Sequence, residues 1–303
     1  MNSMIQTVDL TKKFNDFVAN DHINLDVKEQ EIKCIVGENG AGKSTMMNML
    51  YGLLQPTSGK ILIRGKEVTL NSPVDAIANG IGMVHQHFKL VPSLTVYENI
   101  LLGAEITQKK GGMKTPFIDQ KEEIKRVEKL IQENHLELNA TDKIEDISVG
   151  GRQRVEILKM LYRNVDILIL DEPTAGLDVE ARNEILDMLR AYIAEDESRS
   201  ILITSHISTD LESLCDELYL IHDGKLILHE GTDAILEQYG ILKVSEEQYR
   251  TLDQSSILKV QKENYGYACF TNDKKFYQEN YPQIAVENGG IDELILMMTG
   301  GYR

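Results

Sequence analysis

The sequence has little of several residue types, and each shortage excludes a class of protein. It contains no tryptophan and only three cysteines, Cys34, Cys215 and Cys269, which stand far apart without a C-x-x-C pair. A small fold held by disulfides, or a zinc site built on cysteine pairs, would need more of them at closer spacing. We therefore expect a protein of a reducing compartment.

Long apolar runs and an excess of basic residues are also missing. The longest apolar stretches, such as Ile167–Leu170 and Ile201–Ile203, are far shorter than the roughly 18 residues needed to cross a bilayer. The first residues show no apolar signal core, so we expect neither a membrane span nor secretion. The formal net charge is −16. Because nucleic-acid binding needs a basic surface, this charge argues against a nucleic-acid partner.

What the sequence does contain is ample apolar content, 42% of 303 residues, arranged in two periods. Lys121–His135 has apolar residues at helical spacing among many charges, and Asp166–Leu170 then restores a buried strand. Lys109–Pro116, which precedes the helical segment, is predicted to be a loop. This alternation indicates an α/β protein in which a helical insertion, at about residues 88–163, interrupts a β-rich lobe and its core. Further strands are predicted at Ile5–Leu10, His22–Val27, Glu31–Val36 and Ile61–Leu70.

Three nucleotide-binding motifs follow one another, and the first is GENGAGKST at Gly37–Thr45. It lies between an apolar strand and a helix-compatible run, as a phosphate-binding loop requires. Its glycines let backbone N–H groups, helped by the positive end of the next helix, point at phosphate oxygens. Lys43 would bridge the β- and γ-phosphates, and Ser44 would offer its hydroxyl to Mg²⁺. The predicted nucleotide ligands here are Gly37, Asn39, Gly40, Gly42, Lys43, Ser44 and Thr45.

The third motif, DILILDEPTAGLD, supplies two adjacent carboxylates. Asp171 ends an apolar strand and is predicted to hold the same Mg²⁺ through water. Glu172 is predicted to orient and deprotonate the attacking water, and many phosphate-loop kinases need no such base. This second carboxylate therefore favours hydrolysis of ATP over transfer of its phosphate.

Three further side chains are predicted to reach the nucleotide. Gln86 follows the strand-like Ile81–His85 and would reach the metal and the attacking water. His206 follows the apolar strand Ile201–Thr204 and would reach the γ-phosphate. Phe14 lies upstream of the phosphate loop, where its ring would stack on adenine; the alternative is a place in the core of the β-rich lobe.

The second motif, ISVGGRQRV at Ile147–Val155, completes a set that resembles the ATPase subunits of ABC transporters over residues 1–240. In that family the stretch Ser148-Val149-Gly150-Gly151 is the signature loop, whose helix N-terminus meets the γ-phosphate bound on an opposite subunit. The resemblance implies that Ser148 and Gly150 contact nucleotide and that Asp178 is the D-loop residue. It likewise implies that Phe14 is the adenine-stacking residue, Gln86 the Q-loop residue and His206 the switch histidine.

The resemblance also implies a fold, cofactors and partners. The fold would be a phosphate-loop core with an antiparallel β subdomain, an inserted helical subdomain and a small C-terminal α+β appendage. The cofactors would be ATP and Mg²⁺. The partners would be a second cassette, in the simplest case a homodimer, and a separate integral membrane permease on which the helical insertion docks. The chain would then lie at the cytoplasmic face of the cell membrane.

One position departs from the family pattern L-S-G-G-Q. Val149 stands at the first glycine and Gly151 at the glutamine. Because valine cannot adopt a positive φ cheaply, we expect Val149 in an ordinary backbone conformation with its side chain turned from the phosphate.

The two halves of the sequence resemble different transporters. The first half, including GMVHQHFKLVPSLTVYENILLG, resembles nucleoside and simple-sugar importer ATPases, which usually carry two cassettes in one chain. Beyond Tyr162–Asp171, AGLDVEAR and GGIDELILMMTGG resemble single-cassette exporters of bacterial drug and peptide transporters, as in a natural or constructed mosaic. Chain length and the C-terminal segment slightly favour export of drug, peptide or lipid-like cargo. Import of nucleosides or simple sugars is the alternative. A soluble, non-transport ABC ATPase is a further one, but it would show two cassettes with a charged linker or a long coiled-coil insertion, and the sequence has neither.

The segment after Gly240 is rich in tyrosine and phenylalanine. Strand-like Ser256–Val260 and Ala268–Thr271 predict that residues 241–303 form a packed accessory unit beside a cassette of residues 1–240. The alternative is a helical stripe that closes the core of the cassette itself, formed by Ile291, Leu294, Ile295 and Met298.

Overall fold

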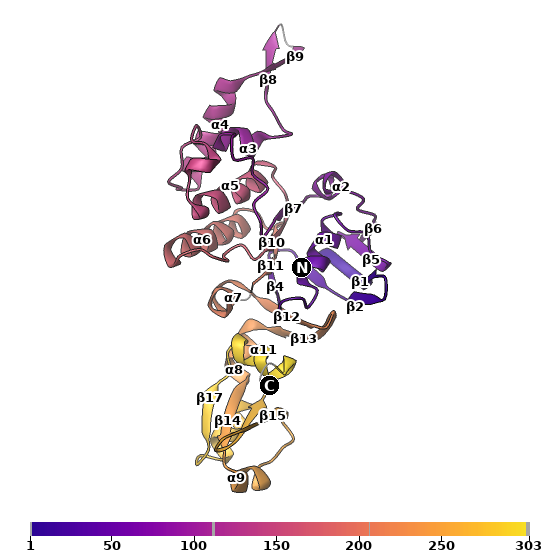
Figure 1. Cartoon of the computed structure of the whole chain (residues 1–303), viewed down its shortest axis with the longest axis vertical. Helices are drawn as coiled ribbons and strands as arrows, with labels where there is room; N and C mark the ends of the chain where they lie inside the picture. Colours follow the sequence, from indigo (N-terminus) through magenta and orange to yellow (C-terminus); the bar gives the residue numbers. More distant parts are fainter. Residues whose placement is uncertain (1, 111–112, 206, 301–303) are drawn as a thin grey trace.

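The computed structural model describes residues 2–110, 113–205 and 207–300. At its centre is a six-stranded sheet of order β13-β12-β4-β11-β10-β7, parallel except for the edge strand β13 (Figure 1). Both faces of this sheet are covered, which is why most residues of its inner strands are apolar. Its strands are β4 (Ile32–Val36), β7 (Ile81–Val84), β10 (Ile167–Asp171), β11 (Ser200–Thr204), β12 (Glu217–His222) and β13 (Lys225–Gly231).

Successive residues of the central strands enter two different cores, because side chains alternate across a strand. In β10, Ile167 and Ile169 pack with the N-terminal lobe. Leu168 and Leu170 pack with the helices on the opposite face. The central sheet therefore joins a β-rich layer to a helical layer.

The N-terminal lobe is an antiparallel sheet of order β2-β1-β5-β6, with β3 paired to β1. Two of the predicted strands are in fact two strands each. His22–Val27 divides between β2 and β3, and Ile61–Leu70 turns at Arg64 and Gly65, whose positive φ values of 49° and 74° make a hairpin. The lobe comprises β1 (Ser3–Phe14), β2 (Phe17–Ile23), β3 (Asp26–Lys28), α1 (Lys43–Leu50), β5 (Ser58–Ile63), β6 (Lys66–Val68) and α2 (Pro73–Ala78).

The helical insertion carries a two-stranded hairpin that projects beyond its helices (Figure 1). The prediction of a loop at Lys109–Pro116 is therefore wrong over its described residues. Lysine and proline weaken a strand pattern, but both are tolerated in a two-stranded ribbon, where each strand is an edge. The insertion comprises α3 (Val96–Leu101), β8 (Thr107–Lys110), β9 (Met113–Ile118), α4 (Gln120–Glu133), the short 3₁₀ helix η1 (Ile144–Asp146) and α5 (Val149–Tyr162).

The rest of the chain completes the helical layer and then forms a third, four-stranded antiparallel sheet of order β15-β16-β14-β17. Together with the two sheets above, this matches the predicted α/β core with its antiparallel β subdomain, helical insertion and C-terminal α+β appendage. The elements are α6 (Val179–Glu195), α7 (Ser208–Leu214), α8 (Thr232–Gln238), β14 (Gly240–Val244), α9 (Glu246–Thr251), β15 (Ile257–Glu263), β16 (Gly266–Thr271), α10 (Lys274–Asn280), β17 (Ala285–Asn288) and α11 (Ile291–Thr299).

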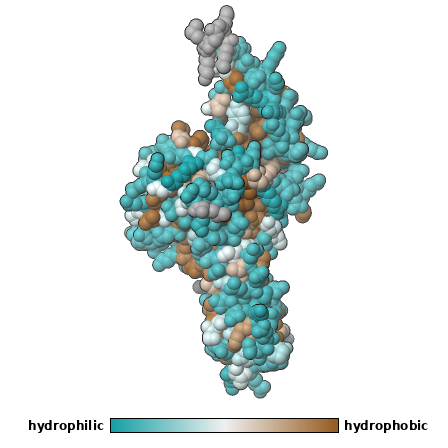
Figure 2. Space-filling model, turned by 180° about the vertical axis from the view of Figure 1, so that it is seen from behind, coloured by the Kyte–Doolittle hydropathy of each residue, from teal (hydrophilic) through white to brown (hydrophobic). Residues whose placement is uncertain are grey.

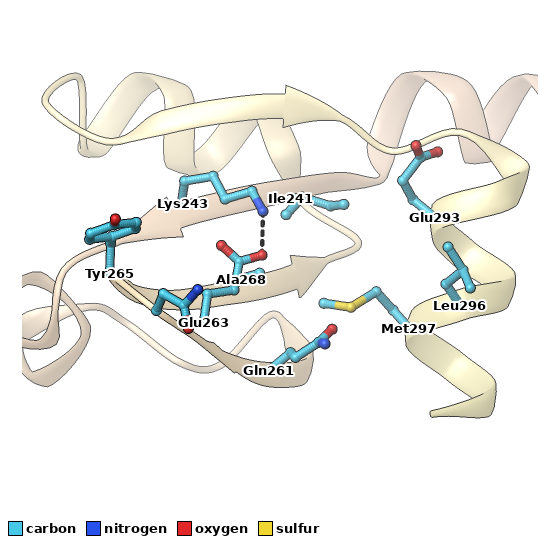
Figure 3. Close-up of a pocket in the computed structure, with 10 residues that line it drawn as sticks. Ile241, Lys243, Gln261, Glu263, Tyr265, Ala268, Glu293, Leu296 and Met297 are labelled. Carbon is cyan, nitrogen blue, oxygen red and sulfur yellow. Dashed lines mark hydrogen bonds and ion pairs between the residues drawn. The ribbon is translucent and has the colours of Figure 1, made fainter. Parts of the chain in front are cut away.

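The C-terminal segment uses the two faces of its sheet differently. One face has a core of its own, which includes Leu242 and Tyr277. The opposite face is turned toward α11, and a cavity of about 540 Å³ lies between that helix and the sheet. Met297 lines this cavity together with the ion pair of Lys243 and Glu263 (Figure 3). Leu294 of the same helix is fully buried in the core shared with the cassette. Helix α11 therefore joins the C-terminal sheet to the cassette.

The surface is mostly polar. Figure 2 shows a largely hydrophilic face on which apolar residues gather in small clusters. Among the described residues, no helix combines the length and the apolar character that a bilayer crossing requires.

A buried lysine of the inner strand β4 pairs with acidic residues in and beside the central sheet. Lys33 has 1% of its side chain exposed, and its ammonium lies 2.8 Å from Glu217 and 3.1 Å from Glu31. His229 lies 2.6 Å from the same oxygen of Glu217. Burial raises the pKa of Glu217, but hydrogen bonds from Lys33 and His229 outweigh it and lower that pKa to about 2. The folded state therefore favours the ionised carboxylate.

We expect Glu217→Gln to lower the free energy of unfolding at pH 7 on the order of 2 kcal/mol. Because folding lowers this pKa, the contribution is full above about pH 4.5 and is lost as the pH falls toward 2. Urea unfolding at pH 7 and pH 3 should show the difference between the two proteins shrinking. Glu67→Gln is the matched control, because its pair with Lys60 is exposed; equal losses in both variants would contradict the prediction.

Candidate nucleotide site

The phosphate loop joins the end of β4 to the start of α1 and is held tightly against its surroundings. Gly42 has φ +106°, and a Cβ atom there would lie 2.4 Å from the carbonyl oxygen of Ala19. A Cβ at Gly37 would lie 2.2 Å from the carbonyl oxygen of Ile221. No side chain fits at either position, so the backbone can follow the tight curve that presents N–H groups to phosphate.

Lys43 is buried inside this loop. Its ammonium donates hydrogen bonds to the carbonyl oxygens of Gly37, at 2.6 Å, and Glu38, at 3.1 Å. The charge is thus fixed at the mouth of the loop, next to the N-terminus of α1. A phosphate placed there would meet a preorganised positive charge and the helix dipole together.

Asp171 and Ser44 meet where β10 ends beside α1. The hydroxyl of Ser44 lies 3.3 Å from Oδ1 of Asp171, and the hydroxyl of Thr204 donates to the same oxygen at 2.7 Å. Asp171 is 5% exposed. A hydroxyl and a carboxylate beside a phosphate loop are the oxygen ligands that Mg²⁺ accepts, so these residues fit that ion.

Glu172 stands next to Asp171 in an uncommon backbone conformation. Its φ is +53°, and the residue is 8% exposed. The N–H of Glu172 donates to both the carbonyl oxygen and the hydroxyl of Thr204, each at 3.1 Å. Non-glycine residues with positive φ cost about 1–3 kcal/mol and gather at functional sites, where surrounding contacts hold them.

A cavity of about 290 Å³ brings most of the predicted ligands together. It is lined by the phosphate loop, by Gln86 from the end of β7 and by Glu172. Phe14 and Phe17 line it as well, paired across the β1–β2 turn. Phe14 is 43% exposed, so it is not a core residue of the lobe, and its ring is accessible to a base. The phosphate-loop residues that line this cavity are Asn39, Gly40, Gly42, Lys43, Ser44 and Thr45.

Of the two histidines expected near this site, the structure describes His85 but not His206. His85 precedes Gln86 and packs against Tyr51 with 5.8 Å between ring centroids. Burial, together with the charge of Lys89, lowers the pKa of His85, so its ring is neutral at pH 7. The predicted contact of His206 with the γ-phosphate falls outside the described residues.

The signature loop lies in a different cavity, of about 620 Å³, which shares no lining residue with the first. Ser148 and Asp178 cap the N-termini of α5 and α6 and accept hydrogen bonds from Gly151 and Ala181. A Cβ at Gly150 would lie 2.9 Å from that of Ala181, so glycine lets the two helix ends approach. One chain thus presents the phosphate loop and the signature loop at separate places.

Val149 is the first residue of α5 and is 51% exposed. Its φ is not positive, as its β-branched side chain requires. The expected ordinary conformation is therefore confirmed.

Three residues of the site were not predicted from the sequence. Phe17 could have been found, because Asn15-Asp16 between two aromatic residues is a hairpin-turn signal. Asn20, whose buried amide donates to the carbonyl oxygen of Gly42 at 3.2 Å, carried no such signal. Neither did Thr204, which reaches Asp171 only through the register of two parallel strands.

Comparisons with known proteins agree with this geometry. The family model described as "ABC transporter" matches residues 20–175. The nucleoside import ATP-binding protein NupA of Lactococcus lactis subsp. cremoris is 45% identical over 225 residues, covering 74% of this chain and 43% of NupA. The guanosine import ATP-binding protein NupO of Bacillus subtilis is also 45% identical over 225 residues, covering 74% and 42%. The chain spans less than half the length of these curated relatives.

Solved structures show the same architecture. A nucleotide-free ATP-binding cassette from an ABC transporter superposes with a TM-score of 0.67 at 25% identity, covering 76% of this chain and 91% of that one. A dimeric ATP-binding cassette bound to ADP and phosphate superposes with a TM-score of 0.64 at 28% identity, covering 76% and 99%. The predicted fold class is confirmed by these matches. The chain belongs to the ABC transporter family and carries the ATP-binding and ATP-hydrolysing domain of that family.

Proposed function

We propose that this chain powers the import of a nucleoside through a separate membrane permease. The observation that carries the proposal is the 45% identity to two nucleoside import proteins over 225 residues. A match of that length runs past Tyr162–Asp171, where the resemblance was expected to change to exporters. The slight preference for export finds no support among these relatives, whereas the importer alternative does.

The proposed chemistry uses the cavity formed by the phosphate loop. Lys43 and the loop N–H groups bind the β- and γ-phosphates, and Phe14 and Phe17 stack on the adenine. Mg²⁺ held by Ser44 and Asp171, with Gln86 near it, would neutralise charge on the transferred phosphoryl group. Glu172 accepts a proton from a water molecule while the oxygen of that water bonds to the γ-phosphorus. The bond between the γ-phosphorus and the ADP oxygen breaks in the same step.

The separation of the two cavities supports a second cassette. Ser148, Gly150 and Asp178 line a surface away from the phosphate loop of their own chain. Such a surface would complete the site of an opposite copy, and the dimeric cassette with ADP and phosphate is a precedent. We propose a homodimer at the cytoplasmic face of the membrane, with the helical insertion docked on the permease.

Transport direction is the test. The chain and the permease that co-purifies with it are placed in proteoliposomes loaded with radiolabelled guanosine, and Mg-ATP is added outside. ATP does not cross the bilayer, so only complexes whose cassettes face outward respond. An importer moves its cargo toward the cassettes, so we expect ATP-driven loss of guanosine from the lumen.

The matched control is the same complex with Glu172→Gln, which should release guanosine no faster than vesicles without ATP. ATP-driven accumulation of external cargo in the lumen would establish export instead. ATP hydrolysis without movement of guanosine, or of the other common ribonucleosides when each is loaded in turn, would reject a nucleoside as the cargo.

A further inference from the structure

Thr204 is the last residue of β11 and contacts both acidic residues of the site. It is fully buried and lies opposite Asp171 in the parallel register of β10 and β11. Its hydroxyl donates to Oδ1 of Asp171 at 2.7 Å. The N–H of Glu172 is shared between this hydroxyl and the carbonyl oxygen of Thr204, each at 3.1 Å. One oxygen atom thus links the side chain of one acid to the backbone of the next.

The two hydrogen bonds of the Thr204 hydroxyl have different effects: one orients the carboxylate of Asp171, and the other holds the backbone of Glu172. Asp171 is a buried carboxylate, and a hydrogen bond from a fixed hydroxyl orients it in one rotamer. Glu172 has a positive φ, which an ordinary residue keeps only when its surroundings hold it. Ser44 also reaches Oδ1 of Asp171, but at the longer distance of 3.3 Å. The hydroxyl of Thr204 therefore makes the shorter of the two hydroxyl contacts to Oδ1 of Asp171.

We propose that Thr204 is a positioning residue for ATP hydrolysis, which holds Asp171 and Glu172 in their relative geometry. It acts through these residues and does not itself touch the nucleotide. A small rotation at Glu172 would move its carboxylate away from the attacking water, and such displacements cost rate rather than affinity. This inference rests on the roles proposed for Asp171 and Glu172.

The test replaces Thr204 with valine, which keeps the shape and removes the hydroxyl, and with serine, which keeps the hydroxyl. We expect Thr204→Val to lower kcat about 10- to 100-fold while the Kd for ATP changes less than about threefold. Thr204→Ser should retain at least about a third of the wild-type kcat. Steady-state hydrolysis and calorimetric ATP binding of the full chain measure both quantities.

A residue that only supports the fold would change stability and ATP affinity, and its effect would add to any other loss. A residue that acts through Glu172 should instead cost little once Glu172 is gone, so Thr204→Val should slow the Glu172→Gln variant less than about threefold. Single-turnover rates of the four proteins give this comparison.

Two results would overturn the proposal. One is a valine variant with near-normal kcat, and the other is a serine variant that loses most of its kcat although it folds. The serine result decides the matter even if the valine variant fails to fold. Normal hydrolysis by Glu172→Gln alone would instead reject the role proposed for Glu172, so the two failures are distinguishable.

Discussion

Glu172→Gln should retain ATP binding while lowering the rate of ATP hydrolysis by at least about 100-fold. The amide keeps the size of the side chain but cannot accept the proton of the attacking water. Because Glu172 lines the same cavity as Lys43, we expect the loss in chemistry without a loss of phosphate contacts. Single-turnover hydrolysis and calorimetric ATP binding measure the two effects separately.

The same variant should form a stable dimer with Mg-ATP, since bound ATP is no longer removed. Sedimentation should show a nucleotide-dependent dimer for Glu172→Gln and a monomer for Lys43→Ala. The lysine variant is the control because it loses the fixed charge that binds phosphate. Near-normal turnover of Glu172→Gln would contradict its role as the base, and a monomer at every nucleotide concentration would argue for a different cassette as partner.

Truncation after Tyr239 should destabilise the whole cassette by several kcal/mol. Ile291, Leu294 and Met297 of α11 are at most 5% exposed and belong to the core that also contains helices α5 and α6. Each such side chain contributes about 1.5–3 kcal/mol by burial, and the truncation would expose the surface that they cover. Thermal unfolding with and without ATP measures the loss.

Two single substitutions separate the roles of the C-terminal segment. Leu294→Ala, in the shared core, should lower the stability of the nucleotide-bound cassette by about 2–5 kcal/mol. Leu242→Ala is the control: it is equally buried but lies in the segment's own core, so it should leave the ATP-stabilised transition almost unchanged. If the truncated chain unfolded at the wild-type temperature and bound ATP normally, the accessory-unit interpretation would replace this one.

The end of α11 also reaches the phosphate loop. The hydroxyl of Thr299 lies 3.1 Å from the carboxylate of Glu38 and 2.8 Å from the carbonyl oxygen of Ile295, so its one proton is shared between them. Glu38 is one of the two residues whose carbonyl oxygens accept from Lys43. Truncation would therefore remove a direct contact to the loop as well as apolar burial. For this reason we expect ATP affinity to fall together with stability.

The motifs of the site could be read from the sequence because each is local. A glycine-rich loop between a strand and a helix needs only its own residues to form, so the phosphate loop was predictable from its spacing. Asp171 and Glu172 follow an apolar strand directly, and the end of such a strand places them at the edge of the sheet. The order of apolar periods indicated an α/β protein with a helical insertion, whereas the antiparallel β subdomain was implied by the resemblance to ABC ATPases.

Tertiary structure alone decided the contacts that join distant segments. The hydroxyl of Thr204 meets Asp171 because β10 and β11 pair in one parallel register, and a shift by one residue would turn it to the other face. Helix α11 packs into the core of the cassette although its apolar stripe would equally suit a separate unit. Apolar periodicity predicts that one face of a helix is buried. Which segment covers that face depends on the packing of the whole chain.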